Sequence, residues 1–257
     1  MRKQEDRHEK ENSIIIGRNA VLEALNAGVE LDKLFVADHP QTGSVNKIIA
    51  VAKQRGIVIK QVSDQKLRVI CGGDNHQGVV ATISCARYAT VEELLQIAAD
   101  RREPPFLILA DVVEDPHNLG ALIRTAEAAG AHGLILPKRR SASLTSVVQK
   151  TSAGAVNLLS VARVTNLVAV MDHLKEQGFW FYAADMKGAP WCEQDYSGPC
   201  GLVIGSEGEG ISRLVLEKCD FRVSLPMRGK ITSLNASVAG GILMYEIARQ
   251  RMGIQAR

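Results

Sequence analysis

The segment FLILADVVEDPHNLGALIRTAEAAGAHGLILP, residues 106–137, determines the expected fold. Its two apolar runs, FLILA and GLILP, have the length of strands, and the residues between them carry apolar side chains at helical spacing. A strand, a helix and a second strand in this order are typical of a parallel sheet. The alternation continues with expected helices at 145–152 and 167–177 and expected strands at 179–185 and 201–205. We therefore expect an α/β domain whose mostly parallel sheet is covered on both faces.

A smaller α/β unit is expected before this domain. Short apolar runs at 14–16, 34–37, 57–60 and 78–84 alternate with helical patterns at 18–28 and 45–55 and one that starts at Ser63. A helical stretch, VEELLQIAAD, and the charged, proline-paired RREPP then mark a boundary. We expect a solvated tail at 1–12, a first domain at 13–85, a linker at 86–103 and a second domain at 104–257.

Composition narrows the class of protein. With 46% hydrophobic residues and 23% charged residues, the chain can bury a sizeable core, and no apolar run approaches the roughly 18 residues of a membrane span. The N-terminus lacks the apolar stretch of a secretory signal. Five cysteines without zinc-ligand spacing favour reduced thiols in the cytoplasm and no metal site. A net charge of +3 is mild for a nucleic-acid binder, so any RNA must be held by local patches.

Three loops that follow expected strands could carry chemistry, since ligands of open α/β sheets bind at the carboxyl ends of strands. In the first, DVVEDPHNLGALIR, Gly120 and Arg124 share a helical stripe away from the apolar positions, and Gly120 would leave room beside Arg124. The simpler interpretation is that Asn118 caps the helix and Arg124 pairs with Glu127.

The second loop, GSEGEG at 205–210, follows a strand and places three glycines where a ligand could approach the backbone closely. It lacks the order of a P-loop or a dinucleotide site, and Glu207 and Glu209 would repel a phosphate. A nucleoside that bears a positive sulfonium would tolerate both carboxylates. A glycine-rich turn without a ligand is the alternative.

The third loop, PMRGKITSLNAS at 226–237, precedes the last helix. Ser233 is expected to cap that helix, and Val238, Ile242 and Tyr245 are expected to face the core. Asn235 then has no evident structural task. This makes it a candidate functional residue.

Together the three segments resemble the TrmH-like branch of the SPOUT methyltransferases, and the match runs from about Phe106 to Arg251. The first loop resembles that family's N-x-G-x-x-x-R motif, the second its GxEGxG motif and the third its PMxGxxxSLNxS motif. The stretches IIGRNAVLEAL and HQGVVA resemble the L30e-like substrate-binding domain of the members that act on ribosomal RNA.

The resemblance implies an enzyme that transfers a methyl group from S-adenosyl-L-methionine (SAM) to the ribose 2′-hydroxyl of a guanosine in 23S ribosomal RNA or its ribosomal precursor. It also implies a deep trefoil knot in the second domain and a homodimer whose active site draws on both subunits. The residues implied at the reacting ribose are Arg124, Asn118, Glu207, Asn235 and Ser233. Those implied at SAM are Gly205, Leu225, Leu234, Gly210 and Met227.

The implied reaction is an in-line displacement that needs no metal, because the sulfonium already activates the methyl group. A guanidinium keeps its proton in ordinary surroundings, so Arg124 is expected to stabilise the developing oxyanion and to hold the adjacent phosphate. A role for Arg124 as the base stays open.

The basic residues Lys138, Arg139, Arg140, Arg228 and Lys230 lie in loops after expected strands, where they would either contact the RNA backbone or form a solvated surface. Two alternatives remain. One is a transfer-RNA (tRNA) 2′-O-methyltransferase, although such enzymes typically lack an N-terminal domain; the other is a non-catalytic RNA-binding protein with the same knot.

Overall fold

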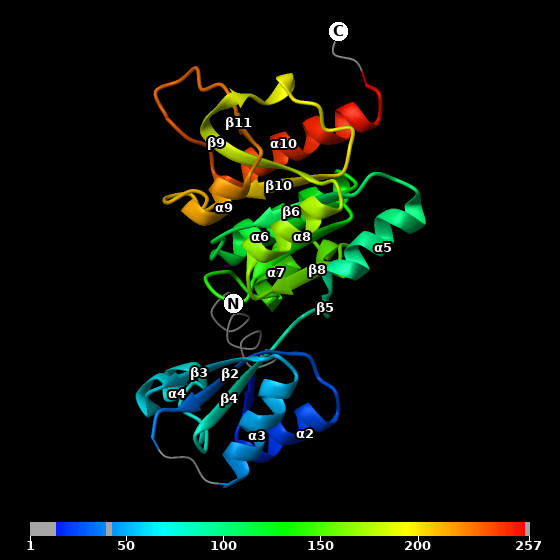
Figure 1. The fold of residues 1–257 in the computed structure, drawn as a ribbon. Coiled ribbons are helices and arrows are strands. Elements are labelled where there is room, and N and C mark those ends of the chain that lie inside the picture. Colours follow the sequence, from blue (N-terminus) through cyan, green and yellow to red (C-terminus); the bar gives the residue numbers. More distant parts are fainter. Residues whose placement is uncertain (1–13, 40–42, 255–257) are drawn as a thin grey trace. The chain divides into compact units, whose positions relative to one another are not determined.

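The computed structural model describes residues 14–39 and 43–254, so the expected tail at 1–12 lies outside the described residues. The chain divides into two units (Figure 1). The first unit comprises the chain up to Arg87 together with the short segment Ser143–Ser146. The second unit comprises Tyr88–Ala142 and the chain from Val147 onward.

The first unit is built on a four-stranded sheet in the order β1-β4-β2-β3. Its strands are β1 (Ile14–Ile16), β2 (Leu31–Ala37), β3 (Val58–Val62) and β4 (Val79–Ile83). β2 and β3 pair in parallel, whereas β4 runs antiparallel to both β1 and β2. Three helices cover it: α2 (Arg18–Asn26), α3 (Gly43–Gln54) and α4 (Asp64–Ile70).

Both faces of this first sheet are buried. Val21 and Leu25 of α2 pack with Val45 and Ile48 of α3 in one apolar cluster, and Leu67 of α4 packs with Val80 in another. Helices therefore pack on this sheet through two separate apolar clusters, whereas Lys60 and Gln61 of β3 remain exposed.

The second unit contains a seven-stranded sheet in the order β11-β9-β10-β6-β7-β8-β5, and every pairing in it is parallel. The strands are β5 (Tyr88–Ala89), β6 (Phe106–Ala110), β7 (Gly133–Pro137), β8 (Val161–Val164), β9 (Trp180–Pro190), β10 (Cys200–Ile204) and β11 (Phe221–Ser224). The helices are α5 (Val91–Arg101), α6 (Pro116–Ala128), α7 (Ser146–Thr151), α8 (Leu167–Glu176), α9 (Arg213–Lys218) and α10 (Ala236–Arg251). Short 3₁₀ turns lie at Ala155–Asn157 and Trp191–Glu193.

Helices cover both faces of this sheet at its centre. Leu109 and Val203 belong to the apolar cluster that also contains Met171 of α8. On the other face Gly240 of α10 lies so close to Ile204 and Leu122 that an added Cβ would fall 2.5 Å from the Ile204 side chain. The expected α/β class with a parallel sheet is therefore confirmed.

The residues between the two expected domains have regular structure. Tyr88 pairs with Val161, and the expected helix VEELLQIAAD is present as α5 with a capping box formed by Thr90 and Glu93. Leu94 of this helix fills the space over Gly133 at the start of β7. The exact domain limits stay predictions.

The five cysteines are free thiols. Burial raises the pKa of Cys200 to about 11 and that of Cys219 to about 12, so both stay protonated at neutral pH. In the described part of the chain, no helix is both long enough and apolar enough to cross a membrane.

Candidate active site

The candidate site lies where β6, β9, β10 and β11 end. Asp111, the first residue after β6, is buried and ties two of these strand ends together. Its backbone N–H donates to the Ile204 carbonyl at 2.8 Å, and its Oδ2 accepts a hydrogen bond from the Ser212 backbone N–H at 2.7 Å. Asp111 was not singled out as a site residue from the sequence, although it is the first polar residue after a fully apolar strand.

The loop at 205–210 folds back on itself. Ser206 and Gly210 exchange two backbone hydrogen bonds, of 3.0 and 3.1 Å, and Gly210 adopts φ +71°. A Cβ at Gly205 would lie 2.1 Å from the backbone carbon of Gly210. These two glycines are therefore required by the closure of the loop, whereas Gly208 has open space around it.

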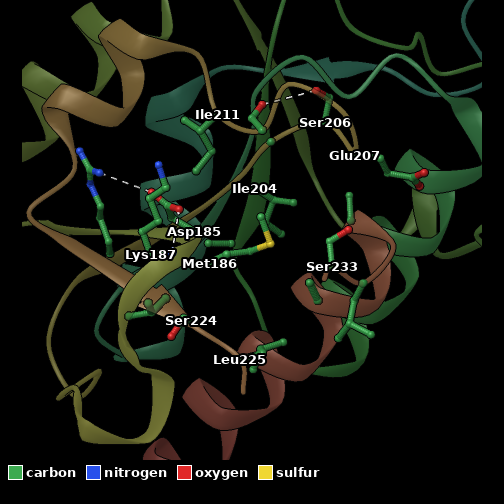
Figure 2. A pocket seen from close by; sticks show the side chains of 18 of the residues that line it. Asp185, Met186, Lys187, Ile204, Ser206, Glu207, Ile211, Ser224, Leu225 and Ser233 are labelled. Carbon is green, nitrogen blue, oxygen red and sulfur yellow. Dashed lines mark hydrogen bonds and ion pairs between the residues drawn. The ribbon is translucent and has the colours of Figure 1, made fainter. Parts of the chain in front are cut away.

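This closed loop forms one wall of a cavity of about 350 Å³, within the range of small-molecule sites. All five residues that the resemblance places at SAM line it: Gly205, Gly210, Leu225, Met227 and Leu234. Figure 2 shows Glu207 and Ser233 on one side of the cavity and Asp185 and Lys187 on the opposite side.

Asp185 also belongs to the cavity wall and was not singled out from the sequence. It lies within β9, 3.5 Å from the guanidinium of Arg222, and accepts a hydrogen bond of 3.0 Å from the Lys187 backbone N–H. Its position at the end of the apolar run FWFYAAD is the signal that could have identified it.

Three polar side chains from distant segments meet beside this cavity. The Asn118 amide donates to Glu207 Oε1 at 2.8 Å, and the Asn235 amide donates both to Asn118 Oδ1 at 2.9 Å and to Glu207 Oε1. Asn118, Glu207 and Asn235 form what we call the amide–carboxylate cluster. A second cavity of about 310 Å³ is lined by Asn118 and Glu207 and shares Gly205 with the first.

Two capping assignments made from the sequence are wrong. Asn235, not Ser233, is the N-cap of α10, because its Oδ1 accepts hydrogen bonds from the backbone N–H groups of Ser237 and Val238. Asp115, not Asn118, caps α6. Ser233 instead lies in the exposed loop and lines the first cavity.

Arg124 is not brought to the cluster within this chain. Its side chain is exposed on α6 and lines neither cavity. The expectation that Gly120 leaves room beside it is wrong, because Gly120 is buried and a Cβ there would lie 1.9 Å from Thr151 Oγ1. Gly120 thus serves the contact of α6 with α7.

The expected inward face of α10 is also wrong. Val238, Ile242 and Tyr245 are 50%, 41% and 51% exposed, while Leu243 and Ile247 are buried. The three exposed side chains line a groove together with Ala121 and Thr125 of α6. The helix thus presents a second apolar face to the surface.

Of the basic residues singled out, Arg140 pairs with Glu209 at 3.0 Å and lines the second cavity. Arg228 and Lys230 are exposed in the loop before α10. Within residues 14–39 and 43–254, no group of three histidine, cysteine or acidic side chains could hold a metal ion.

Comparison with known proteins gives two matching families. One described as the SpoU rRNA Methylase family matches residues 105–245, and one described as RNA 2′-O ribose methyltransferase substrate binding matches residues 14–89. A putative TrmH family tRNA/rRNA methyltransferase, YacO, of Bacillus subtilis is 46% identical, over 94% of this chain and 97% of its own.

Two solved structures extend the comparison. An AdoMet-bound rRNA methyltransferase from Sinorhizobium meliloti is 27% identical with a TM-score of 0.58, over 98% of this chain and 92% of its own. A TrmH/SpoU tRNA modifying enzyme from A. aeolicus is 30% identical with a TM-score of 0.54, over 63% of this chain and 84% of its own. The resemblance found in the sequence is thereby confirmed, and the chain belongs to the SpoU rRNA Methylase family.

Proposed function

We propose that this protein transfers a methyl group from SAM to the ribose 2′-hydroxyl of a guanosine in 23S ribosomal RNA or its precursor, in the cytoplasm. One observation carries the proposal. At one edge of a parallel sheet, the amide–carboxylate cluster lies beside a cavity that has a glycine loop as one wall. Membership of the SpoU rRNA Methylase family supports methyl transfer, and the AdoMet-bound relative supports the methyl donor.

The first cavity fits the chemistry of SAM. Leu225, Met227 and Leu234 offer apolar surface, and Gly205 lets the backbone approach the ligand without a Cβ. When bound, SAM supplies a methyl group activated by a positively charged sulfur. The carboxylates of Asp185 and Glu207, which both line the cavity, suit a ligand of that charge.

The cluster would handle the proton of the reacting ribose. Methylation converts the 2′-hydroxyl into an ether, so its proton must leave. The amides of Asn118 and Asn235 both bind Glu207 Oε1, and within the described residues Oε2 has no hydrogen-bond partner. We assign Glu207 Oε2 as the proton acceptor, Asn118 and Asn235 as the groups that orient it, and Ser233 as a contact of the ribose.

Arg124 completes the site from a second subunit in this proposal. Its guanidinium stabilises charge that develops on the 2′-oxygen and holds the adjacent phosphate. The exposure of Arg124, and its absence from both cavities of its own chain, support this assignment. The groove between α6 and α10, with exposed Val238, Ile242 and Tyr245, supplies an apolar face for a second copy, and Arg124 neighbours its α6 residues.

A mixing experiment tests the shared site. We expect Arg124→Ala and Asn235→Ala proteins to be inactive alone and, after subunit exchange in equal amounts, to recover about a quarter of wild-type activity. The recovery arises because each mixed dimer then contains one intact site. If Arg124 acts within its own subunit, no mixed dimer contains an intact site and no activity returns.

The first unit favours ribosomal RNA over tRNA as the substrate. The match to the S. meliloti rRNA methyltransferase covers 98% of this chain, whereas the match to the A. aeolicus tRNA modifying enzyme covers 63%. The family that matches residues 14–89 is described as substrate binding.

Methyl transfer from labelled SAM to unmodified 23S ribosomal RNA, and separately to unmodified tRNA, tests the activity and the substrate together. After nuclease digestion, we expect 2′-O-methylguanosine from ribosomal RNA alone. Label in tRNA would overturn the substrate and keep the reaction. A protein that binds SAM but labels neither RNA, nor an assembling ribosomal precursor, would be a non-catalytic RNA-binding protein.

A further inference from the structure

The amino edge of the seven-stranded sheet carries a third cavity, of about 270 Å³. Trp180 begins β9 and Phe221 begins β11, and both line this cavity together with Tyr182, Gln194, Asp195 and Ser197. Because all strands are parallel, this edge lies opposite the one that holds the candidate active site. The proposed methyl transfer uses none of these residues.

The aromatic rings of this cavity are ordered by mutual contact and only partly covered. Phe221 stacks on Tyr182 with ring centroids 5.0 Å apart and an interplanar angle of 18°, and it contacts Trp180 at 5.7 Å. Tyr182 is buried and its hydroxyl donates to the Asp195 carbonyl at 2.5 Å. Trp180 and Phe221 remain 53% and 36% exposed. The cavity therefore offers ring faces to a ligand from outside.

The polar groups around these rings are mostly acceptors. The exposed carboxylate of Asp195 accepts a 2.9 Å hydrogen bond from the Ser197 backbone N–H. Hydrogen bonds from Ser197 lower the pKa of Asp195, so the carboxylate is ionised at neutral pH. Among the described residues that line the cavity there is no lysine or arginine. Lys175, which does not line the cavity, pairs with Asp220 at 2.5 Å.

This combination discriminates between ligand classes. A phosphate-bearing ligand would meet the Asp195 charge without a cation to offset it. A neutral aromatic ligand would bury the Asp195 carboxylate without offering it a positive charge. A planar guanidinium can stack on Trp180 and Phe221 and also pair with Asp195. We propose that this cavity binds an exposed arginine side chain of a basic segment in a partner protein.

The two tryptophans of the chain, Trp180 and Trp191, make the proposal measurable by fluorescence. In a Trp191→Phe protein, Trp180 is the only indole. We expect its emission to change saturably on titration with a blocked Gly-Arg-Gly peptide. Binding of the Gly-citrulline-Gly peptide, which has nearly the same shape without the charge, should be about tenfold weaker.

Three variants test whether the arginine peptide binds at this cavity. Asp195→Asn should weaken binding of the arginine peptide about tenfold, whereas Glu193→Gln, the same change of charge outside the cavity, should leave it unchanged. Phe221→Leu should also weaken binding of the arginine peptide, measured by the same Trp180 fluorescence, because one aromatic ring is lost. Methyl transfer to RNA should be unaffected in all three, so this test is independent of the proposed function.

Three results would overturn the proposal: equal binding of the arginine and citrulline peptides, equal effects of the substitutions at Asp195 and Glu193, or no saturable change with the arginine peptide. Saturation by guanosine monophosphate in place of the arginine peptide would identify a base-stacking surface for RNA instead.

Discussion

The amino and carboxyl edges of the seven-stranded sheet differ in how their polar groups are arranged. At the amino edge, Arg251 donates hydrogen bonds to the carbonyls of Pro105, Tyr196 and Gly198, and His132 accepts one from the Phe106 backbone N–H at 2.9 Å. At the carboxyl edge, closed loops leave their backbone facing two cavities. At β6 and β10, hydrogen bonds thus tie both edges together, but of these two edges only the carboxyl edge borders the first and second cavities.

The largest expected effect is at the carboxyl edge, from Gly205→Ala. The new Cβ would lie 2.1 Å from the Gly210 backbone, so the loop must move and the cavity must change shape. We expect SAM affinity to fall about 100-fold by calorimetry. Gly208→Ala is the matched control, because nothing lies within 4 Å of its added Cβ. Equal losses in both proteins would show that closure of the loop does not shape the site.

Asn235 combines a structural and a proposed functional task. Asn235→Ala removes the cap of α10, which costs about 1 kcal/mol, and also frees Glu207. Asn235→Asp keeps a capping oxygen but places a second carboxylate beside Glu207. We expect Asn235→Asp to retain the melting temperature and to lose about 100-fold in kcat. Normal turnover in that variant would remove the amide from the mechanism.

At the amino edge, loss of a polar group should affect stability and leave turnover unchanged. Arg251→Met removes the hydrogen bond that the Gly198 carbonyl accepts and one of the two that the Pro105 carbonyl accepts, and we expect the free energy of unfolding to fall by about 2 kcal/mol in urea titrations. The kcat of methyl transfer should not change. A large fall in kcat at unchanged stability would contradict the division between the edges.

The smallest effect concerns pH. Desolvation lowers the pKa of buried His132 below 6.5, so the unfolded chain binds a proton more readily than the folded one. Its contribution to stability is therefore complete above pH 6.5 and is lost as the pH falls through that value toward the lower folded pKa, by at most about 1.4 kcal/mol per pH unit. His132→Asn should flatten the dependence of melting temperature on pH between 6.5 and 5. An unchanged slope would assign the acid sensitivity to other groups.

The sequence predicts the parallel sheet and the loops that surround the candidate site, but not the order of the strands. The glycines and Glu207 of the loop at 205–210 are recognisable because this loop directly follows an apolar strand, at the edge where parallel sheets bind ligands. The face of α10 is not recognisable. Its apolar residues lie on two sides, with Leu243 and Ile247 buried and Val238 and Ile242 exposed, so periodicity cannot distinguish the core from the surface. Asn235 and Ser233 are both good caps, and only the hydrogen bonds decide between them.

The sheet order has a consequence for how the protein is made. β6 pairs with β10, although β7, β8 and β9 are synthesised between them, and the first cavity also needs Leu243 of α10. The first unit takes its strands from residues 14–83 and can fold while the second is still being translated. The first cavity therefore cannot be complete until α10 has been synthesised, and a polypeptide truncated before α10 lacks it.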